Sequence, residues 1–126
     1  MAITQVFIGT PSNLVSFTDT AMGNTPDAVK ASSALLYSVS IDNSLNASPV
    51  YVKLFNLAAG SVVVGTTAPD EIIYVPLSSK ITHQYFTTAL AGKTFATALS
   101  AICVTAGGTA GSTSPASSVP VTLNYV

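Results

Sequence analysis

Hydrophobic and polar residues alternate along much of this chain. From Leu35 to Asp42 an apolar side chain occupies nearly every second position, and the same period of two returns in residues 50–55 and 119–125. Successive side chains of a β-strand point to opposite faces, so this period is typical of strands that bury one face. The pattern therefore predicts well-defined strands in these segments.

Shorter apolar stretches, bounded by Gly, Pro, Asn or Ser, predict further strands. The candidates are residues 4–8, 14–17, 62–64, 71–77 and 81–86. The pattern shows none of the strand–helix alternation that builds a parallel sheet. The segments together predict an all-β chain, a single antiparallel β-sandwich of about seven to nine strands with immunoglobulin-like or jelly-roll topology.

Residues 86–102 allow two interpretations. Their Ala and Leu residues are good helix formers, whereas Gly92 and several Thr residues oppose a helix. Phe95, Thr97 and Leu99 alternate with small residues, as they would in a strand. We therefore expect a strand over residues 94–105.

The weakest pattern lies at the start of the chain. We expect residues 1–33 to form an N-terminal segment or arm with weak strands, packed on the sandwich or on a partner. Residues 34–126 then form the sandwich core. Residues 107–115 are rich in Gly and Ser, which predicts a mobile loop unless a partner packs on it.

Residues 71–77 are apolar on both faces of their predicted strand. A sandwich strand needs only one apolar face for its own core. We therefore expect Ile72 and Tyr74 to contact a neighbouring subunit, together with Tyr51 and Phe55, which are on the corresponding face of another strand. The alternative is that a loop of the same chain, above all the N-terminal segment, covers this face.

The composition also favours association. Hydrophobic residues make up 48% of the chain and charged residues only 7%, whereas charge normally keeps a monomer's surface from sticking to its neighbours. A surface covered by partners explains this balance. The alternative is a monomer whose Ser- and Thr-rich strands face water.

Few side chains could carry chemistry. His83 is the only histidine and Cys103 the only cysteine, so no structural zinc set can form, and any Ser-His-Asp or Cys-His site would need this one strand histidine. Asp70 and Glu71 follow a proline, as residues of a turn do. Residues 107–111 lack the Lys-Ser/Thr of a phosphate loop. We expect no catalytic residues, no metal and no cofactor, and therefore no enzyme.

Charge and hydropathy limit the other classes of partner. The net charge is −1 and the four cations are all lysines, so we expect no binding to nucleic acid. The first residues lack the basic and apolar regions of a secretory signal, and no apolar run is long enough to span a bilayer. We expect synthesis in the cytoplasm of a host and no membrane partner.

Several segments of this sequence resemble those of a known class of proteins. They are ALLYSVSIDN at 34–43, YVKLFN at 51–56, TTAPD at 66–70, TFATALS at 94–100 and GGTAGSTSP at 107–115. In their residues and in their order along the chain, these segments resemble small β-sandwich structural proteins of tailed bacteriophages, particularly those of cyanobacteria and other aquatic hosts. The resemblance covers residues 34–126 and transfers no functional residue, because it contains no catalytic motif.

The resemblance implies a component of the virion. Such a protein would decorate or cement the capsid, or belong to a fibre or tail, and its partners would be itself and other virion proteins such as the major capsid protein. A trimer is the favoured form, since capsid decoration sites and fibres commonly have threefold symmetry. The alternative is a carbohydrate- or receptor-binding module at the tip of a phage fibre.

Overall fold

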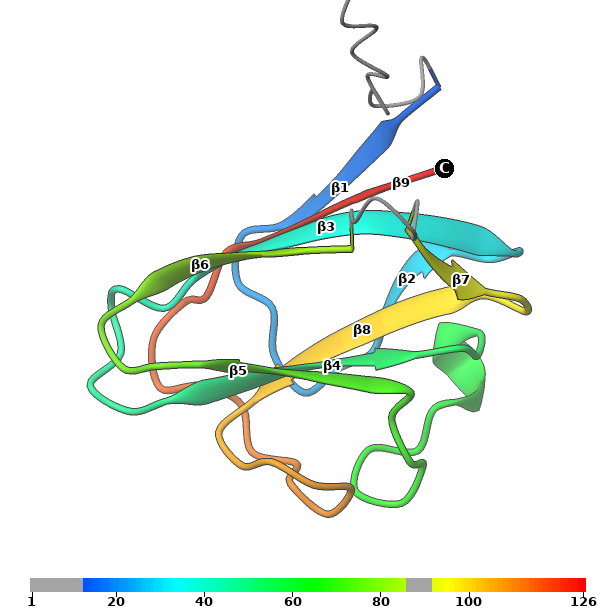
Figure 1. Ribbon diagram of the computed structural model, residues 1–126. Helices are drawn as coiled ribbons and strands as arrows, with labels where there is room; N and C mark the ends of the chain where they lie inside the picture. Colours follow the sequence, from blue (N-terminus) through cyan, green and yellow to red (C-terminus); the bar gives the residue numbers. More distant parts are fainter. Residues whose placement is uncertain (1–12, 86–91) are drawn as a thin grey trace, which may run out of the picture.

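A computed structural model describes residues 13–85 and 92–126 of the protein, and these form two antiparallel β-sheets packed face to face (Figure 1). Its nine strands are β1 Val15–Asp19, β2 Asp27–Lys30, β3 Ala34–Asp42, β4 Val50–Phe55, β5 Glu71–Val75, β6 Lys80–Gln84, β7 Lys93–Phe95, β8 Leu99–Val104 and β9 Val121–Tyr125. A 3-10 turn, Ala59–Ser61, follows β4. The described segments contain no helix that could cross a membrane. The expected β-sandwich is confirmed.

The strand order distinguishes the two expected topologies. Sheet A has the order β1-β9-β3-β6, with β7 paired to the start of β3, and sheet B has the order β2-β8-β4-β5. If the short β7 is left aside, the chain changes sheet at every step except from β4 to β5. An immunoglobulin fold instead keeps its first two strands in one sheet. The order is that of an eight-stranded jelly roll.

The main core fills the space between the sheets. Every second residue of the central strands points into it, among them Val39 and Ile41 of β3, Val52 and Leu54 of β4, and Leu123 of β9, all at most 2% exposed. Burying side chains of this size contributes about 1.5–3 kcal/mol each. The alternation predicted for residues 119–125 is confirmed, and Val50, Val52 and Leu54 face the main core as predicted. In β3 a register shift between Leu36 and Ser38 places Leu36 in the core in place of Leu35 and Tyr37, so the predicted alternation holds only over residues 38–42.

Several expected strands change in the structure. The strand expected over 14–17 is β1, Val15–Asp19, and the one expected over 119–125 is β9, which begins at Val121. The run at 62–64 is not a strand and belongs to the β4–β5 loop. The segment expected as one strand over 94–105 is divided into β7, in sheet A, and β8, in sheet B. The strand expected over 71–77 ends at Val75, and Pro76 follows it. The strand expected over 81–86 is β6, which ends at Gln84.

Residues 15–30 belong to the sandwich itself. They supply β1 at one edge of sheet A and β2 at one edge of sheet B. β1 pairs along its whole length with β9, from Val15 opposite Tyr125 to Asp19 opposite Val121. The weak strand expected at 4–8 lies outside the described residues.

Two buried asparagines hold the loops together at one end of the sandwich. The side chain of Asn43 donates to the carbonyls of Ser48 and Pro76, both at 3.0 Å. The side chain of Asn46 donates to the Ser117 carbonyl at 3.1 Å and accepts from the Ser117 N–H at 2.8 Å. These bonds tie the β3–β4 loop to the loops before β6 and β9.

The Asn46 bonds should contribute measurably to stability. Asn46→Ala leaves a partly buried N–H and C=O of Ser117 without these partners, so we expect the free energy of unfolding to fall by about 2–3 kcal/mol. Urea denaturation measures this change. Asn24→Ala removes a comparable bond, to the Ser112 carbonyl, at an exposed site and should cost about 0.5 kcal/mol. Equal losses of unfolding free energy in the two variants would show that Asn46 does not hold the loops together.

Candidate interaction surface

Sheet B carries a second apolar cluster on its outer face. Phe55 of β4 and Ile102 and Val104 of β8 point away from the main core. The β4–β5 loop folds back over them, and its Val62 packs into the cluster. The loop that joins β4 to β5 within sheet B thus covers the apolar centre of that sheet.

The loop between β8 and β9 covers the next part of the face. Lys53 lies beneath it with only 1% of its surface exposed, and its Nζ donates to the carbonyl of Gly111 at 2.9 Å. Burial lowers the pKa of Lys53. A Cβ at position 111 would lie 2.2 Å from the Ala106 carbonyl oxygen, so only glycine fits there. The Gly- and Ser-rich segment, expected to be mobile unless a partner packs on it, is packed on its own sheet.

The edge strand β5 remains outside this cover. One row of side chains on the outer face runs from Val104 through Tyr51 to Tyr74, and exposure rises along it from 0% at Val104 to 52% at Tyr74. Ile72, in the adjacent row, is 38% exposed. The rings of Tyr51 and Tyr74 lie 5.5 Å apart and are tilted by 58°. We call Ile72, Tyr74 and the half-buried Tyr51 the β5 patch.

Three of the four expected interface residues therefore come together, and the fourth does not. Phe55 is on the same outer face as Tyr51, as the alternation predicted, but it is only 1% exposed because the β4–β5 loop covers it. Phe55 is thus unavailable to a partner unless that loop moves. Leu45 and Leu77, in two loops tied together through Asn46 and Ser78, are more exposed than any residue of the β5 patch. Both leucines lie in turn-rich segments without a strand pattern, so the sequence did not indicate that they are exposed.

The outer face of sheet A has the opposite character. Small polar side chains from neighbouring strands bond to one another across it. The bonded pairs are Ser16–Asn124, Thr18–Thr122, Ser38–Asn124 and Ser40–Thr82. Lys80 and Asp42 form an exposed ion pair, at 3.5 Å, at one end of this face. This sheet needs no cover, because its polar groups satisfy each other or meet water.

The side chains that could carry chemistry are packed or scattered. The His83 ring contacts the Tyr85 ring edge-on, with centroids 4.7 Å apart, as expected of a strand histidine. Burial raises the pKa of Cys103 to about 12, so its thiol is unreactive at neutral pH. Over residues 13–85 and 92–126, no group of three or more His, Cys, Asp or Glu side chains could hold a metal.

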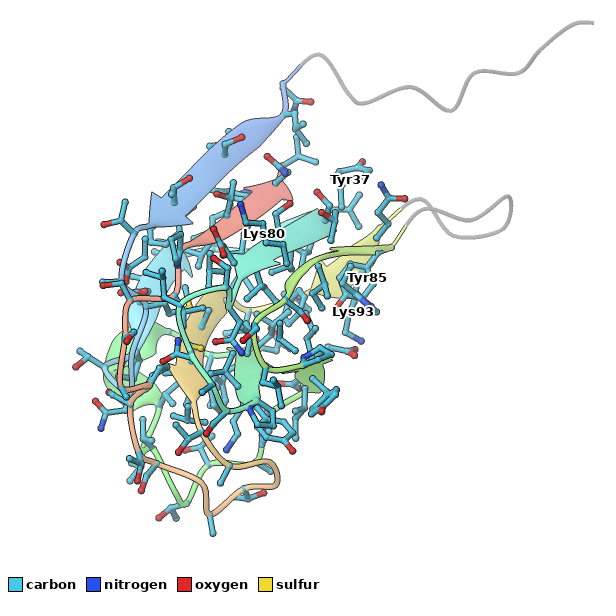
Figure 2. All side chains as sticks on the ribbon, turned by 90° about the vertical axis from the view of Figure 1, so that its left-hand side faces the viewer. Tyr37, Lys80, Tyr85 and Lys93 are labelled. Atoms are coloured by element: carbon cyan, nitrogen blue, oxygen red, sulfur yellow. The ribbon has the colours of Figure 1, made fainter. Side chains whose placement is uncertain are left out.

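A cluster of charged and aromatic side chains lies where β5, β6 and β7 approach one another. Lys93 pairs with Glu71 at 3.5 Å, and its Nζ lies 5.9 Å from the centre of the Phe95 ring. Burial, with the nearby Glu71 carboxylate adding to it, raises the pKa of Tyr85. Figure 2 shows Tyr85 and Lys93 on the same side of the molecule. Glu71 is neutralised within the chain, which leaves no unpaired charge on β5.

A hollow at one end of the sandwich offers little to a substrate. Its volume is about 450 Å³, and it lies where the β3–β4 loop meets the loop between β8 and β9. The lining residues are Asn46, Ala47, Ser48, Pro49, Val50, Thr105 and Ala116. None of these side chains is charged or aromatic, so the hollow has neither an acid–base group nor a stacking platform.

No protein-family model, curated protein or solved structure matches the chain. The resemblance to phage structural proteins therefore stays a prediction.

One pKa shift gives the stability a pH dependence. Burial, aided by a hydrogen bond and repulsion from Asp19, raises the pKa of Asp27 from 3.8 to about 7. The folded protein thus holds a proton that the unfolded chain releases once the pH exceeds its own lower pKa. Stability should fall as pH rises from about 4 to about 7, because the native state binds more protons in that window.

Urea denaturation at pH 5 and pH 8 tests this expectation. The wild type should be less stable at pH 8, and Asp27→Asn should reduce the difference by removing the titrating group. Asp42→Asn is the control. Hydrogen bonds from Ser44 lower the pKa of Asp42, so the titration of Asp42 changes the stability only below this pH window. Equal pH dependence in the wild type and Asp27→Asn would contradict the assignment.

Proposed function

We propose that this protein is a structural subunit that acts by self-association in the virion of a tailed bacteriophage. It would serve as a capsid decoration or cement protein, or as a fibre or tail subunit, with no chemistry of its own. The observation that carries the proposal is the β5 patch. Loops cover the rest of the apolar centre of sheet B, whereas Ile72 and Tyr74 remain exposed.

The character of this patch supports a protein partner. Tyr is enriched at protein interfaces because its ring buries much apolar area while its hydroxyl stays hydrated. The chain carries only four Lys and five Asp or Glu residues, so two copies repel each other weakly. A surface of this kind gains from being covered by another copy.

The virion part of the proposal rests on analogy. Jelly rolls build viral capsid domains, but they also occur in lectins and cupins, and a fold alone does not fix a function. The resemblance of several segments to phage structural proteins, itself a prediction, favours the first of these uses. In this proposal the subunit also contacts other virion proteins, such as the major capsid protein, and mass spectrometry of purified particles would detect it there.

A carbohydrate- or receptor-binding module is the second candidate. Tyr51 and Tyr74 give an aromatic platform of the kind that stacks on a sugar ring. A sugar also needs hydrogen-bonding side chains beside the rings. The neighbouring polar side chain on this face, Lys53, cannot serve because it is buried and bonded to the carbonyl of Gly111. Binding to a glycan array that Tyr74→Ala abolishes would favour this candidate.

A pair of variants tests the leading proposal. Tyr74→Ala should reduce self-association and leave the free energy of unfolding of the subunit nearly unchanged, since Tyr74 is half exposed. Phe55→Ala should instead lower this free energy by about 3–5 kcal/mol, because it opens a cavity in the second cluster. Sedimentation equilibrium measures association, and urea denaturation at low protein concentration measures stability.

The wild-type chain should sediment above the monomer mass within a range from about 1 to about 200 µM. A strict monomer over this range would contradict the proposal. So would an oligomer that Tyr74→Ala leaves unchanged. A trimer would use a heterologous contact between two different patches, which can coexist with a twofold contact elsewhere on the surface.

A further inference from the structure

The edge strands β1, β2, β5 and β6 differ in how they are protected from pairing with other chains. Natural edge strands are blunted by Lys, Pro, bulges or inward charges. The register of β2 shifts between Ala28 and Lys30, and β6 begins with the exposed Lys80. Outward-facing Ser16 and Thr18 of β1 bond to neighbours on β9, so the outer face of this edge offers a partner no apolar side chain. The exposed apolar residue of β1, Val15, lies on its other face.

The edge of β5 has only one of these protections, the charge of Glu71 on its inner face, and Lys93 neutralises that charge within the chain. All five of its residues pair in regular register with β4, from Glu71 opposite Leu54 to Val75 opposite Val50. It contains neither Pro nor Lys. Its one charge, Glu71, is paired with Lys93 at 3.5 Å. Its outward-facing side chains, Ile72 and Tyr74, are apolar or aromatic and exposed.

We propose that β5 pairs antiparallel with β5 of a second copy of this chain, across a twofold axis at Ile73. This contact would join the two B sheets edge to edge into one eight-stranded sheet. The inference rests on the proposed function and names the surface through which self-association occurs. A twofold contact needs only a self-complementary edge, because both copies present the same residues.

One register satisfies the whole strand. With Ile73 opposite the partner's Ile73, all five residues are paired, and Ile72 lies opposite the partner's Tyr74 on the outer face. Directly opposite residues of paired strands share a face, so this register keeps both outer faces on the same side. Glu71 then lies opposite the partner's Val75 and away from the partner's Glu71. The two Tyr51–Tyr74 pairs are thereby joined into one apolar band.

The contact is small. Two five-residue strands and their flanking side chains bury less than the about 1,600 Å² of a standard stable interface. A single contact of this size gives weak association. When many copies are held in one assembly, the effective concentration of each edge is high, and the same contact becomes stronger. The experiment therefore uses a trap for the paired state.

Two cysteine variants report the register. Directly opposite Cβ atoms lie about 4.5–5.5 Å apart and diagonal ones about 7–8 Å apart, so only opposite cysteines come within reach of a disulfide. We expect a mixture of Ile72→Cys and Tyr74→Cys chains to form disulfide dimers under mild oxidation. Each variant alone should form at least tenfold fewer. Cys103 does not interfere, because it is buried and its pKa is raised to about 12.

A charge series provides an independent measurement by sedimentation. Tyr74→Glu and Ile72→Lys should each weaken self-association at least tenfold, since each places an unpaired charge in the contact. The double variant should recover to within about threefold of wild type, because each Lys then faces the partner's Glu. Val15→Glu, on the edge strand β1, is the matched control and should leave association unchanged.

The outcomes separate this inference from the proposed function. Oligomers that form no disulfide in the mixture, or that Val15→Glu weakens as much as Tyr74→Glu, would overturn the β5 pairing while leaving self-association in place. A wild-type chain that stays monomeric would overturn the proposed function itself. Circular dichroism and thermal melting of every variant verify that the fold is retained.

Discussion

Sheet B is apolar on both of its faces, and the arrangement of the loops depends on how its outer face is kept from water. The inner face packs on sheet A, as in any sandwich. On the outer face Phe55, Ile102 and Val104 would be exposed if the connections were short. The β4–β5 loop and the loop between β8 and β9 are long because they form a third layer over this face. Lys53 lies within that layer, and the Gly111 carbonyl satisfies its amine.

This cover ends before it reaches β5, and the two sheets consequently present different surfaces. Sheet A has a face of hydroxyls and amides that bond across the strands and suit contact with water. Sheet B has a buried centre and one open edge, where Ile72 and Tyr74 remain exposed. The uncovered β5 patch on a weakly charged molecule is the feature from which the proposed self-association follows.

The sequence predicted the regular part of the fold because β-strands have a simple period. Val39 and Ile41 of β3, and Val50, Val52 and Leu54 of β4, point into the main core at every second position, and this period is visible without any tertiary information. It could not show that residues 94–105 divide into two strands. The bend between β7 and β8 is held by Asn56 Oδ1, which accepts from the N–H of Thr97 at 2.8 Å. That bond joins residues far apart in the chain and has no local signal.

The candidate site was predictable to a similar degree. Two apolar faces on residues 71–75 indicated that one face needs a second cover, and the pairing of Tyr51 with Tyr74 follows from strand order. The burial of Phe55 was not predictable, since the three consecutive valines at 62–64 favour a strand but lie in a loop. Val62 and Val64 of that loop pack against the cluster, whereas Val63 is exposed. Hydrogen bonds from Thr66 and Thr67 to the Val63 carbonyl fix that loop.

The most direct test of this account is amide hydrogen exchange measured as a function of protein concentration. Amides of residues 71–75 should gain protection as concentration rises, because pairing engages the free edge of β5. Residues 15–19 of β1 should show no such change. Protection of residues 71–75 that is independent of concentration in an associating protein, or equal gains in β1, would contradict the claim that β5 is the association surface.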